Sequence, residues 1–214
     1  MIKDLFNKYG CDKSKKHCYD LFYQPLVDAH VDKEINFLEI GVFKADSTVA
    51  FEESLPKASI YGADIFKRVD IQNCRNRFAA NSQVYFEKCN SMEKTSVINC
   101  MKAFNNVKFD IIIDDGAHYP KANQLTFENF IPYLKKGGIY VIEDVWPIDR
   151  MTMKQLEHVW LKQYPDRYNQ LEQNRFVTSL NQAKDQYNLE IKEHDFRSKS
   201  GEPDSYILEI IKHG

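Results

Sequence analysis

The chain has 214 residues, of which 43% are hydrophobic and 28% are charged, and its formal net charge is −2. This length and composition are typical of one soluble globular domain with its own hydrophobic core. The near-zero charge gives no electrostatic reason to expect nucleic acid as a partner, and no apolar run approaches the roughly 18 residues that a membrane span needs.

Residues 1–34 precede the first strand-like run and carry two helix-like stretches, IKDLFNKY and CYDLFYQPLVDAH. They contain no apolar signal-peptide run, so we expect a cytoplasmic protein, with reduced thiols at its cysteines. The helices are expected to form a cover over a site. For Lys13 and His17 the favoured interpretation is a solvated basic loop. Tyr19, Phe22 and Tyr23 are expected to pack in the core or the cover.

Five near-continuous apolar runs alternate with helix-like stretches between residues 35 and 145. The runs lie at 35–42 (INFLEIGV), 58–65 (ASIYGADI), 83–89 (QVYFEKC), 109–115 (FDIIIDD) and 137–145 (GGIYVIEDV). Such runs fit strands that are buried on both faces of a parallel sheet, so the alternation predicts a doubly wound α/β fold. Helices are expected at 46–55, 91–104 and 121–138, with N-caps at Asp46 or Ser47 and at Ser91.

Two further strand-like runs, LEIKEHDF and SYILEIIKH, are joined by the turn-forming stretch RSKSGEPD. They predict an antiparallel hairpin at one edge of the sheet. A helix is expected around 151–163, and the segment 151–187 carries little core pattern, so it is assigned to acceptor specificity or to dimerisation. The expected organisation is one domain, 1–214, with a helical cover (1–34), a core (35–146), and a specificity segment with the hairpin (147–214).

Polar and acidic residues follow the carboxyl ends of the predicted parallel strands, where open α/β sheets bind ligands. They are Glu39, Gly41, Asp64, Asn90, Ser91, Asp114, Asp115, His118, Glu143 and Asp144. Asp64 ends the second strand and is suited to accept hydrogen bonds from ribose hydroxyls, or alternatively to cap a helix. Gly41 stands without the further glycines that a pyrophosphate needs, so a nucleoside without phosphates fits better.

Three of these carboxylates, Asp115, Glu143 and Asp144, form an all-oxygen set that favours a hard divalent ion such as Mg²⁺ over zinc. Adjacent strand residues point to opposite faces, so we assign Asp115 to the metal and Asp114 to the cofactor, or to a structural role. His118 is suited to accept a proton from a metal-bound hydroxyl near neutral pH. Its alternative role is to cap the next helix or to bond locally.

The stretches FLEIGVFKADS, YGADI and FDIIIDDGAH…GGIYVIEDV together resemble class I S-adenosylmethionine-dependent methyltransferases. IDDGAH followed by YVIED, with the N-terminal KYGCDKSKKHCY, resembles the metal-dependent sugar O-methyltransferases of macrolide biosynthesis. The resemblance covers residues 8–146, and it also makes Lys13 and His17 candidates for substrate contact. It implies a seven-stranded, Rossmann-like sheet, magnesium on Asp115, Glu143 and Asp144, and His118 as the general base.

The same resemblance implies roles for the residues at the first three strand ends. Gly41, with Glu39 nearby, would line the methionine part of the cofactor, Asp64 would bind the ribose, and the Asn90–Ser91 region would lie near the adenine. The chain departs from the family pattern in two places. Its FKAD turn has Ala45 where a glycine-containing turn is usual, and an aspartate is more usual at the Asn90 position.

The function implied by the resemblance is S-adenosylmethionine-dependent, metal-assisted O-methylation of a hydroxyl on a sugar or similar polyol. The expected partner is a small hydroxylated acceptor, with no nucleic acid or membrane, and a homo-oligomer is left open. Two alternatives stay open: a methyltransferase for another small acceptor, with a phosphorylated or amino group, and a non-catalytic nucleoside-binding relative. Trp146 either walls a substrate pocket or fills the core.

Overall fold

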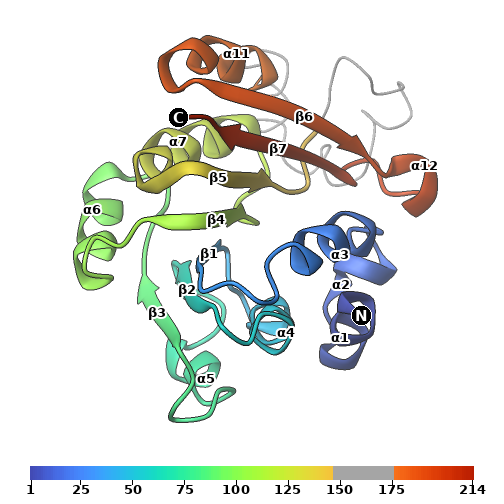
Figure 1. Cartoon of the computed structure of the whole chain (residues 1–214), viewed down its shortest axis with the longest axis vertical. Helices are drawn as coiled ribbons and strands as arrows, with labels where there is room; N and C mark the ends of the chain where they lie inside the picture. Colours follow the sequence, from blue (N-terminus) through green and yellow to red (C-terminus); the bar gives the residue numbers. More distant parts are fainter. Residues whose placement is uncertain (147–175) are drawn as a thin grey trace.

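One seven-stranded sheet organises the molecule (Figure 1), and the computed structural model describes residues 1–146 and 176–214. The strands are β1 (Asn36–Ile40), β2 (Ser59–Asp64), β3 (Val84–Lys88), β4 (Phe109–Asp114), β5 (Leu134–Ile142), β6 (Leu189–Asp195) and β7 (Tyr206–Lys212). Their spatial order is β3-β2-β1-β4-β5-β7-β6. This confirms the predicted strands and the doubly wound, mostly parallel sheet.

The order of the strands reverses between β1 and β4, which pair in parallel. β5 pairs with β4 in parallel and with β7 antiparallel, and β6 and β7 pair antiparallel. The expected C-terminal hairpin is therefore confirmed at the sheet edge. A change of direction of this kind leaves a crevice beyond the carboxyl ends of β1 and β4, which is where a ligand is expected.

Helices cover both faces of the sheet (Figure 1). They are α1 (Ile2–Tyr9), α2 (Asp12–Lys15), α3 (Asp20–Asp28), α4 (Asp46–Ser54), α5 (Ile71–Arg75), α6 (Lys94–Ala103), α7 (Pro120–Phe130), α11 (Phe176–Tyr187) and α12 (Arg197–Ser200), with a short 3₁₀ helix η1 (Ile131–Tyr133). Side chains of α1, α3 and α4 form one core with one sheet face, and those of α6, α7 and α11 form another with the opposite face. None of the described helices is both long and apolar enough to cross a bilayer.

The predicted N-terminal helices are confirmed, and their packing follows from the spacing of their apolar residues. Ile2 and Phe6 lie one turn apart in α1 and are both buried, since residues four apart share a helix face. The helix ends at Gly10, which is left-handed at φ 77° and donates its N–H to carbonyls of the last turn. Helix α1 packs against α4, so the first segment of the chain lies on the sheet face that α4 covers (Figure 1).

The helix expected at 121–138 is shorter than predicted. Helix α7 ends at Phe130, the chain makes a 3₁₀ turn, and Leu134 already pairs with Phe109 in the sheet. Pro132 lacks the N–H that a continuing α-helix would need, so the helix stops there. Gly137 is left-handed, and the β4–β5 register shifts beside it, so this stretch is an irregular strand start and the predicted helix end at Gly137 is wrong.

The region after β5 is only partly described. The helix predicted around 151–163 lies outside the described residues. The last part of the 151–187 segment is α11, whose Leu180 is buried in the core with α7, so this part does carry a core residue. The connection between β6 and β7 contains the short helix α12, which ends at left-handed Gly201, and is therefore more regular than a plain hairpin loop.

Candidate active site

A cavity of about 1120 Å³ lies beyond the carboxyl ends of the parallel strands. The predicted site residues that line it are Gly41, Asp64, Asn90, Ser91, Asp115, His118, Glu143 and Asp144. Glu39 and Asp114 were also predicted but are not part of the lining. Trp146 both lines the cavity and is buried, so the two interpretations of this residue hold together. The sheet topology therefore brings most of the predicted set to one place.

The turn after β1 runs against the turn after β4. The N–H of Asp115 donates to the carbonyl of Ile40 at 2.9 Å. Gly41 has φ +90°, and a Cβ at this position would lie 2.0 Å from the carbonyl oxygen of Asp115. Only glycine tolerates both the backbone angle and the close approach. Gly41 therefore allows the turn after β1, on the predicted cofactor side of the cavity, to pack directly against the turn after β4, on the predicted metal side.

Glu39 is fully buried beneath this turn and accepts hydrogen bonds from the hydroxyls of Ser47 and Thr48. It holds the start of α4 in place instead of lining the cavity. The N-cap residue of α4 is Ala45, in a left-handed conformation at φ 61°. The prediction that Asp46 or Ser47 is the N-cap is therefore wrong. The Ser47 hydroxyl bonds to Glu39 across the turn, which a local capping rule does not anticipate.

Asp64 ends β2 and holds two backbone amides. Its Oδ2 accepts from the N–H of Phe43 at 2.9 Å and its Oδ1 from the N–H of Phe66 at 2.7 Å. The alternative that Asp64 caps a helix is wrong, because Asp70 caps the next helix, α5. A carboxylate has about four acceptor positions, so Asp64 keeps acceptor capacity for hydroxyls in the cavity.

Asn90 and Ser91 follow β3 on the cavity wall. The side-chain amide of Asn90 donates to Glu93 at 2.8 Å, and the Ser91 hydroxyl lies 2.8 Å from that of Thr126 on α7. Helix α6 begins only at Lys94, so Ser91 is not its N-cap as predicted. These contacts fix a wall of backbone and short polar side chains.

Asp115, His118 and Asp144 meet at the ends of β4 and β5. One oxygen or ring nitrogen of each lies within 4.8 Å of the other two, and His118 Nε2 is 3.5 Å from Asp115 Oδ1. His118 and Asp144 both have a left-handed backbone conformation, at φ 53° and 52°. This conformation is strained for residues other than glycine. All three are partly exposed. The two carboxylates of this group are the kind of oxygen ligand that a hard divalent ion prefers.

His118 lies at the start of α7 but does not cap it, since Tyr119 is the N-cap residue. Its Nδ1 is buried and has no hydrogen-bond partner among the described residues. Burial acts to lower the pKa of His118, but the neighbouring carboxylates of Asp144 and Asp115 outweigh it and raise the pKa above its ordinary value. The charge of the imidazole therefore depends on these carboxylates.

Glu143 is the predicted metal ligand that lies deepest. Its Oε2 is 2.5 Å from the Lys13 ammonium, and its Oε1 accepts from the Tyr23 hydroxyl. Lys13 also lies 2.6 Å from Asp115 Oδ2 and is only 2% exposed, so the solvated loop expected for Lys13 is wrong. Burial raises the pKa of Glu143 well above its usual range, against the opposing effect of Lys13.

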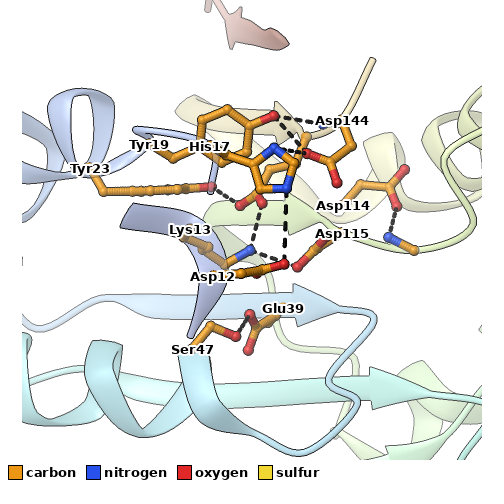
Figure 2. A network of polar contacts seen from close by, with 12 residues as sticks. Asp12, Lys13, His17, Tyr19, Tyr23, Glu39, Ser47, Asp114, Asp115 and Asp144 are labelled. Carbon is orange, nitrogen blue, oxygen red and sulfur yellow. Dashed lines mark hydrogen bonds and ion pairs between the residues drawn. The ribbon is translucent and has the colours of Figure 1, made fainter. Parts of the chain in front are cut away.

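Asp144 is held by the same N-terminal segment (Figure 2). The Tyr19 hydroxyl donates to Asp144 Oδ1 at 2.7 Å, and His17 Nδ1 lies 3.5 Å from the same oxygen and 2.9 Å from the Ser205 hydroxyl. His17 is 2% exposed, so the solvated loop is wrong for it as well. Burial opposes the charge of Asp144, but His118 and His17 lower its pKa below the ordinary value.

Asp114 points to the other face of β4, as strand alternation predicts. Its Oδ1 accepts from the N–H of Gly116 at 3.2 Å, and its Oδ2 has no hydrogen-bond partner in the described part of the chain. Burial raises the pKa of Asp114 to about 7. The residue is thus beneath the cavity floor, and its cofactor role stays a prediction.

The N-terminal polar residues contact the acidic residues of the site far more than their sequence predicts. Lys13 and His17 lie four residues apart, as do Tyr19 and Tyr23, and all four contact acidic residues at the strand ends (Figure 2). The tyrosines are core residues, as predicted, but their hydroxyls bind carboxylates. The four-residue spacing and the family resemblance of KYGCDKSKKHCY both indicated that these side chains act together. Their carboxylate partners lie about 100 residues or more away in the sequence, and no local pattern identifies such partners.

Curated proteins with similar sequences include two O-methyltransferases. Mycinamicin VI 2''-O-methyltransferase of Micromonospora griseorubida is 29% identical over 136 residues, which cover 58% of this chain and 32% of that protein. Demethylmacrocin O-methyltransferase of Streptomyces fradiae is 47% identical over 155 residues, 68% of this chain and 36% of that protein. The chain spans about a third of the length of the curated relatives it matches.

Solved structures share the fold. MycE, a methyltransferase of the mycinamycin pathway solved with Mg and SAH, superposes with a TM-score of 0.69 at 20% identity, over 99% of this chain and 54% of that one. A putative caffeoyl-CoA O-methyltransferase from Staphylococcus aureus gives 0.62 at 17%, over 91% and 82%. The sequence profile of a methyltransferase domain matches residues 32–195. The chain therefore belongs to the methyltransferase domain family, as its strand-end motifs predicted.

Proposed function

We propose that the protein is an S-adenosylmethionine-dependent, divalent-metal-assisted O-methyltransferase that acts on a hydroxyl of a sugar or similar polyol. The observation that carries the proposal is the meeting of Asp115, His118 and Asp144 in the same cavity as the Gly41 turn. A methyl donor and a hydroxyl-activating site must lie within reach of each other, and this cavity holds candidate residues for both.

The cofactor would lie on the β1–β3 side. Gly41 allows close approach of a ligand to the backbone, Asp64 offers acceptor positions for ribose hydroxyls, and the Asn90–Ser91 wall faces the cavity. A bound S-adenosylmethionine would supply an electrophilic methyl group. The Phe43 and Phe66 amides hold Asp64 in a fixed direction, which supports its assignment to the ribose.

A divalent ion would be held by Asp115 and Asp144, with Glu143 as the third carboxylate. When bound, such an ion lowers the pKa of a coordinated hydroxyl and fixes its direction. Asp115 and Asp144 present oxygens beside His118, whereas the oxygens of Glu143 contact Lys13 and Tyr23. Tyr19 and His17 orient Asp144, and Lys13 orients Asp115.

His118 is the proposed general base. Its Nε2 lies beside Asp115 Oδ1, and the ring is partly exposed in the cavity. From this position the ring would accept the proton of an acceptor hydroxyl held at the same carboxylates. A positioned base of this kind contributes about 10²–10⁴-fold to the rate.

The acceptor class rests on the relatives. Mycinamicin VI 2''-O-methyltransferase and 8-demethyl-8-alpha-L-rhamnosyl tetracenomycin-C 2'-O-methyltransferase are named for methylation of glycosylated natural products, which supports a sugar hydroxyl as acceptor. The cavity is large enough for a nucleoside together with a sugar ring.

The test combines binding and turnover. S-adenosylhomocysteine is titrated by calorimetry with Mg²⁺ and with chelator, and methyl transfer from S-adenosylmethionine is followed by product mass over a panel of macrolide glycosides and simpler sugars. We expect binding in both conditions, near −8 kcal/mol for a micromolar Kd, and ion-dependent transfer. His118→Ala should lose at least about 100-fold in kcat and retain S-adenosylhomocysteine affinity.

His213→Ala is the matched control, because His213 lies on the exposed C-terminal end with Glu190 as its partner. It should leave kcat unchanged. Transfer by His118→Ala at the wild-type rate would contradict the base assignment. Absence of S-adenosylhomocysteine binding in both conditions would contradict the methyltransferase proposal itself.

A further inference from the structure

The Lys13 ammonium occupies the space between two of the proposed metal-binding carboxylates. Its Nζ is 2.6 Å from Asp115 Oδ2 and 2.5 Å from Glu143 Oε2. Lys13 and Glu143 are 2% and 1% exposed. An ammonium that bridges two carboxylates at these distances fills the position that a divalent ion would take between them.

Asp115 faces two cation positions at once. Its Oδ2 contacts Lys13, whereas its Oδ1 points to His118 and belongs to the group completed by Asp144. The first position lies deep in the protein, and the second lies at the partly exposed cavity floor. The chain therefore supplies one of the cations in this acidic cluster from its own sequence.

We propose that Lys13 is a built-in counter-ion of the metal site, so that the divalent ion is an exchangeable activator and not a tightly held structural ion. This inference rests on the proposed function. Without an ion, the ammonium keeps Asp115 and Glu143 together and limits their mutual repulsion. With an ion in the site, the ammonium repels it and weakens its binding.

A variant that lacks this ammonium should differ from the wild type in two linked properties, its stability without an ion and its affinity for the ion. The variant should be destabilised when no divalent ion is present, because two buried carboxylates lose their counter-ion. It should also bind the ion more tightly, because the negative charge is no longer shared with Lys13. Thermodynamic linkage joins the two, so the ion must restore stability in the variant more than in the wild type.

Lys13→Met tests both statements, since methionine keeps the length and apolar stem of lysine without its charge. Mn²⁺ binding is measured by electron paramagnetic resonance, and thermal unfolding is followed with chelator and with saturating Mn²⁺. We expect a Kd for Mn²⁺ that is lower by at least about tenfold. With chelator the melting temperature should fall by about 5–15 °C, and Mn²⁺ should recover at least half of this loss.

Lys15→Met is the matched control, because Lys15 lies on the same short helix α2 but is exposed. It should match the wild type in both measurements. If Lys13→Met binds Mn²⁺ no more tightly than the wild type, or loses the same stability with and without the ion, Lys13 is a structural residue only and the inference is overturned.

A second variant covers the case in which Lys13→Met does not fold. Lys13→Met/Glu143→Gln also removes the excess negative charge, so it should fold with chelator and bind Mn²⁺ less tightly than Lys13→Met in Mn²⁺-refolded samples. A double variant no more stable than the single one would overturn the inference.

Failure of the proposed function gives a different pattern. If neither wild type nor Lys13→Met binds Mn²⁺, both the metal site and the counter-ion role are wrong, and the S-adenosylhomocysteine titration then shows separately whether the cofactor site exists. If only Lys13→Met binds Mn²⁺, the ammonium alone fills the wild-type site, and the inference that the wild type uses an exchangeable ion is overturned.

Discussion

The two halves of the cavity are built in different ways. On the β1–β3 side, the backbone does most of the positioning: Gly41 approaches Asp115, and Asp64 accepts two nearby amides. On the β4–β5 side, Glu143 and Asp144 are positioned by side chains from the N-terminal segment. A backbone-built half needs only the right turn, whereas a side-chain-built half needs partners from far along the chain.

The strongest break in the backbone-built half is Gly41→Ala. The added Cβ would lie 2.0 Å from the Asp115 carbonyl oxygen, at φ +90°. Overpacking and backbone strain together should cost about 3–5 kcal/mol of unfolding free energy and abolish S-adenosylhomocysteine binding. Urea unfolding and calorimetry measure the two effects.

Gly10→Ala separates strain from contact. Gly10 has φ +77°, but a Cβ there would meet nothing within 4 Å. It should cost only about 1–2 kcal/mol, the strain of a left-handed alanine. Equal losses in the two variants would show that the approach to Asp115 is not what requires glycine at position 41.

Asp114 offers the next largest effect, and it has a defined pH dependence. Its pKa is about 7 in the folded protein because of burial, and near 3.9 in the unfolded chain. Between these values the folded state binds more protons, so this residue makes stability fall as pH rises from about 4 to 7.

Asp114→Asn removes the titrating carboxyl group. The wild-type and variant free energies of unfolding should agree near pH 4, and at pH 8 the variant should be more stable by about 2–4 kcal/mol. Urea titrations with chelator at both pH values measure the difference. A constant difference across the pH range would mean that Asp114 is not the group that titrates.

Two buried tyrosines test the side-chain-built half. The Tyr23 hydroxyl donates to Glu143, whereas that of Tyr140 has no hydrogen-bond partner in the described regions. Tyr23→Phe should cost about 1–3 kcal/mol because Glu143 is left with less compensation. Tyr140→Phe should be neutral or stabilising. Thermal unfolding measures both variants. A loss in Tyr140→Phe equal to that in Tyr23→Phe would show that the hydrogen bond to Glu143 is not the cause.

The contrast between the two halves also decides what could be predicted from sequence. The strand-like runs predicted all seven strands. Strand-end position alone predicted that Asp64, Asp115 and Asp144 come together, since parallel strands end at one edge, and all three line the cavity. The helix end at Gly137 was wrong because a sheet partner, Phe109, overrides a local stop signal. Lys13 was misjudged because its burial depends on Glu143, 130 residues further on.

The smallest expected effect concerns Ala45, in the turn after β1. Ala45 is fully buried and left-handed at φ 61°, and Arg77 binds Asp46 and the Lys44 carbonyl beside it. The surrounding contacts therefore hold alanine in a conformation that glycine adopts without strain.

Ala45→Gly removes about 1–2 kcal/mol of strain but adds unfolded-state entropy of about 0.4–1 kcal/mol. Loss of the buried Ala45 methyl costs about 0.8 kcal/mol more. The net expectation is therefore a change of less than about 1 kcal/mol in either direction, with an unchanged Kd for S-adenosylhomocysteine. Urea unfolding and calorimetry test both. A large gain in affinity would mean that the alanine distorts this turn in the wild type. An unchanged Kd would mean that the surrounding contacts set the conformation of the turn, so that this half of the cavity tolerates a residue other than glycine at position 45.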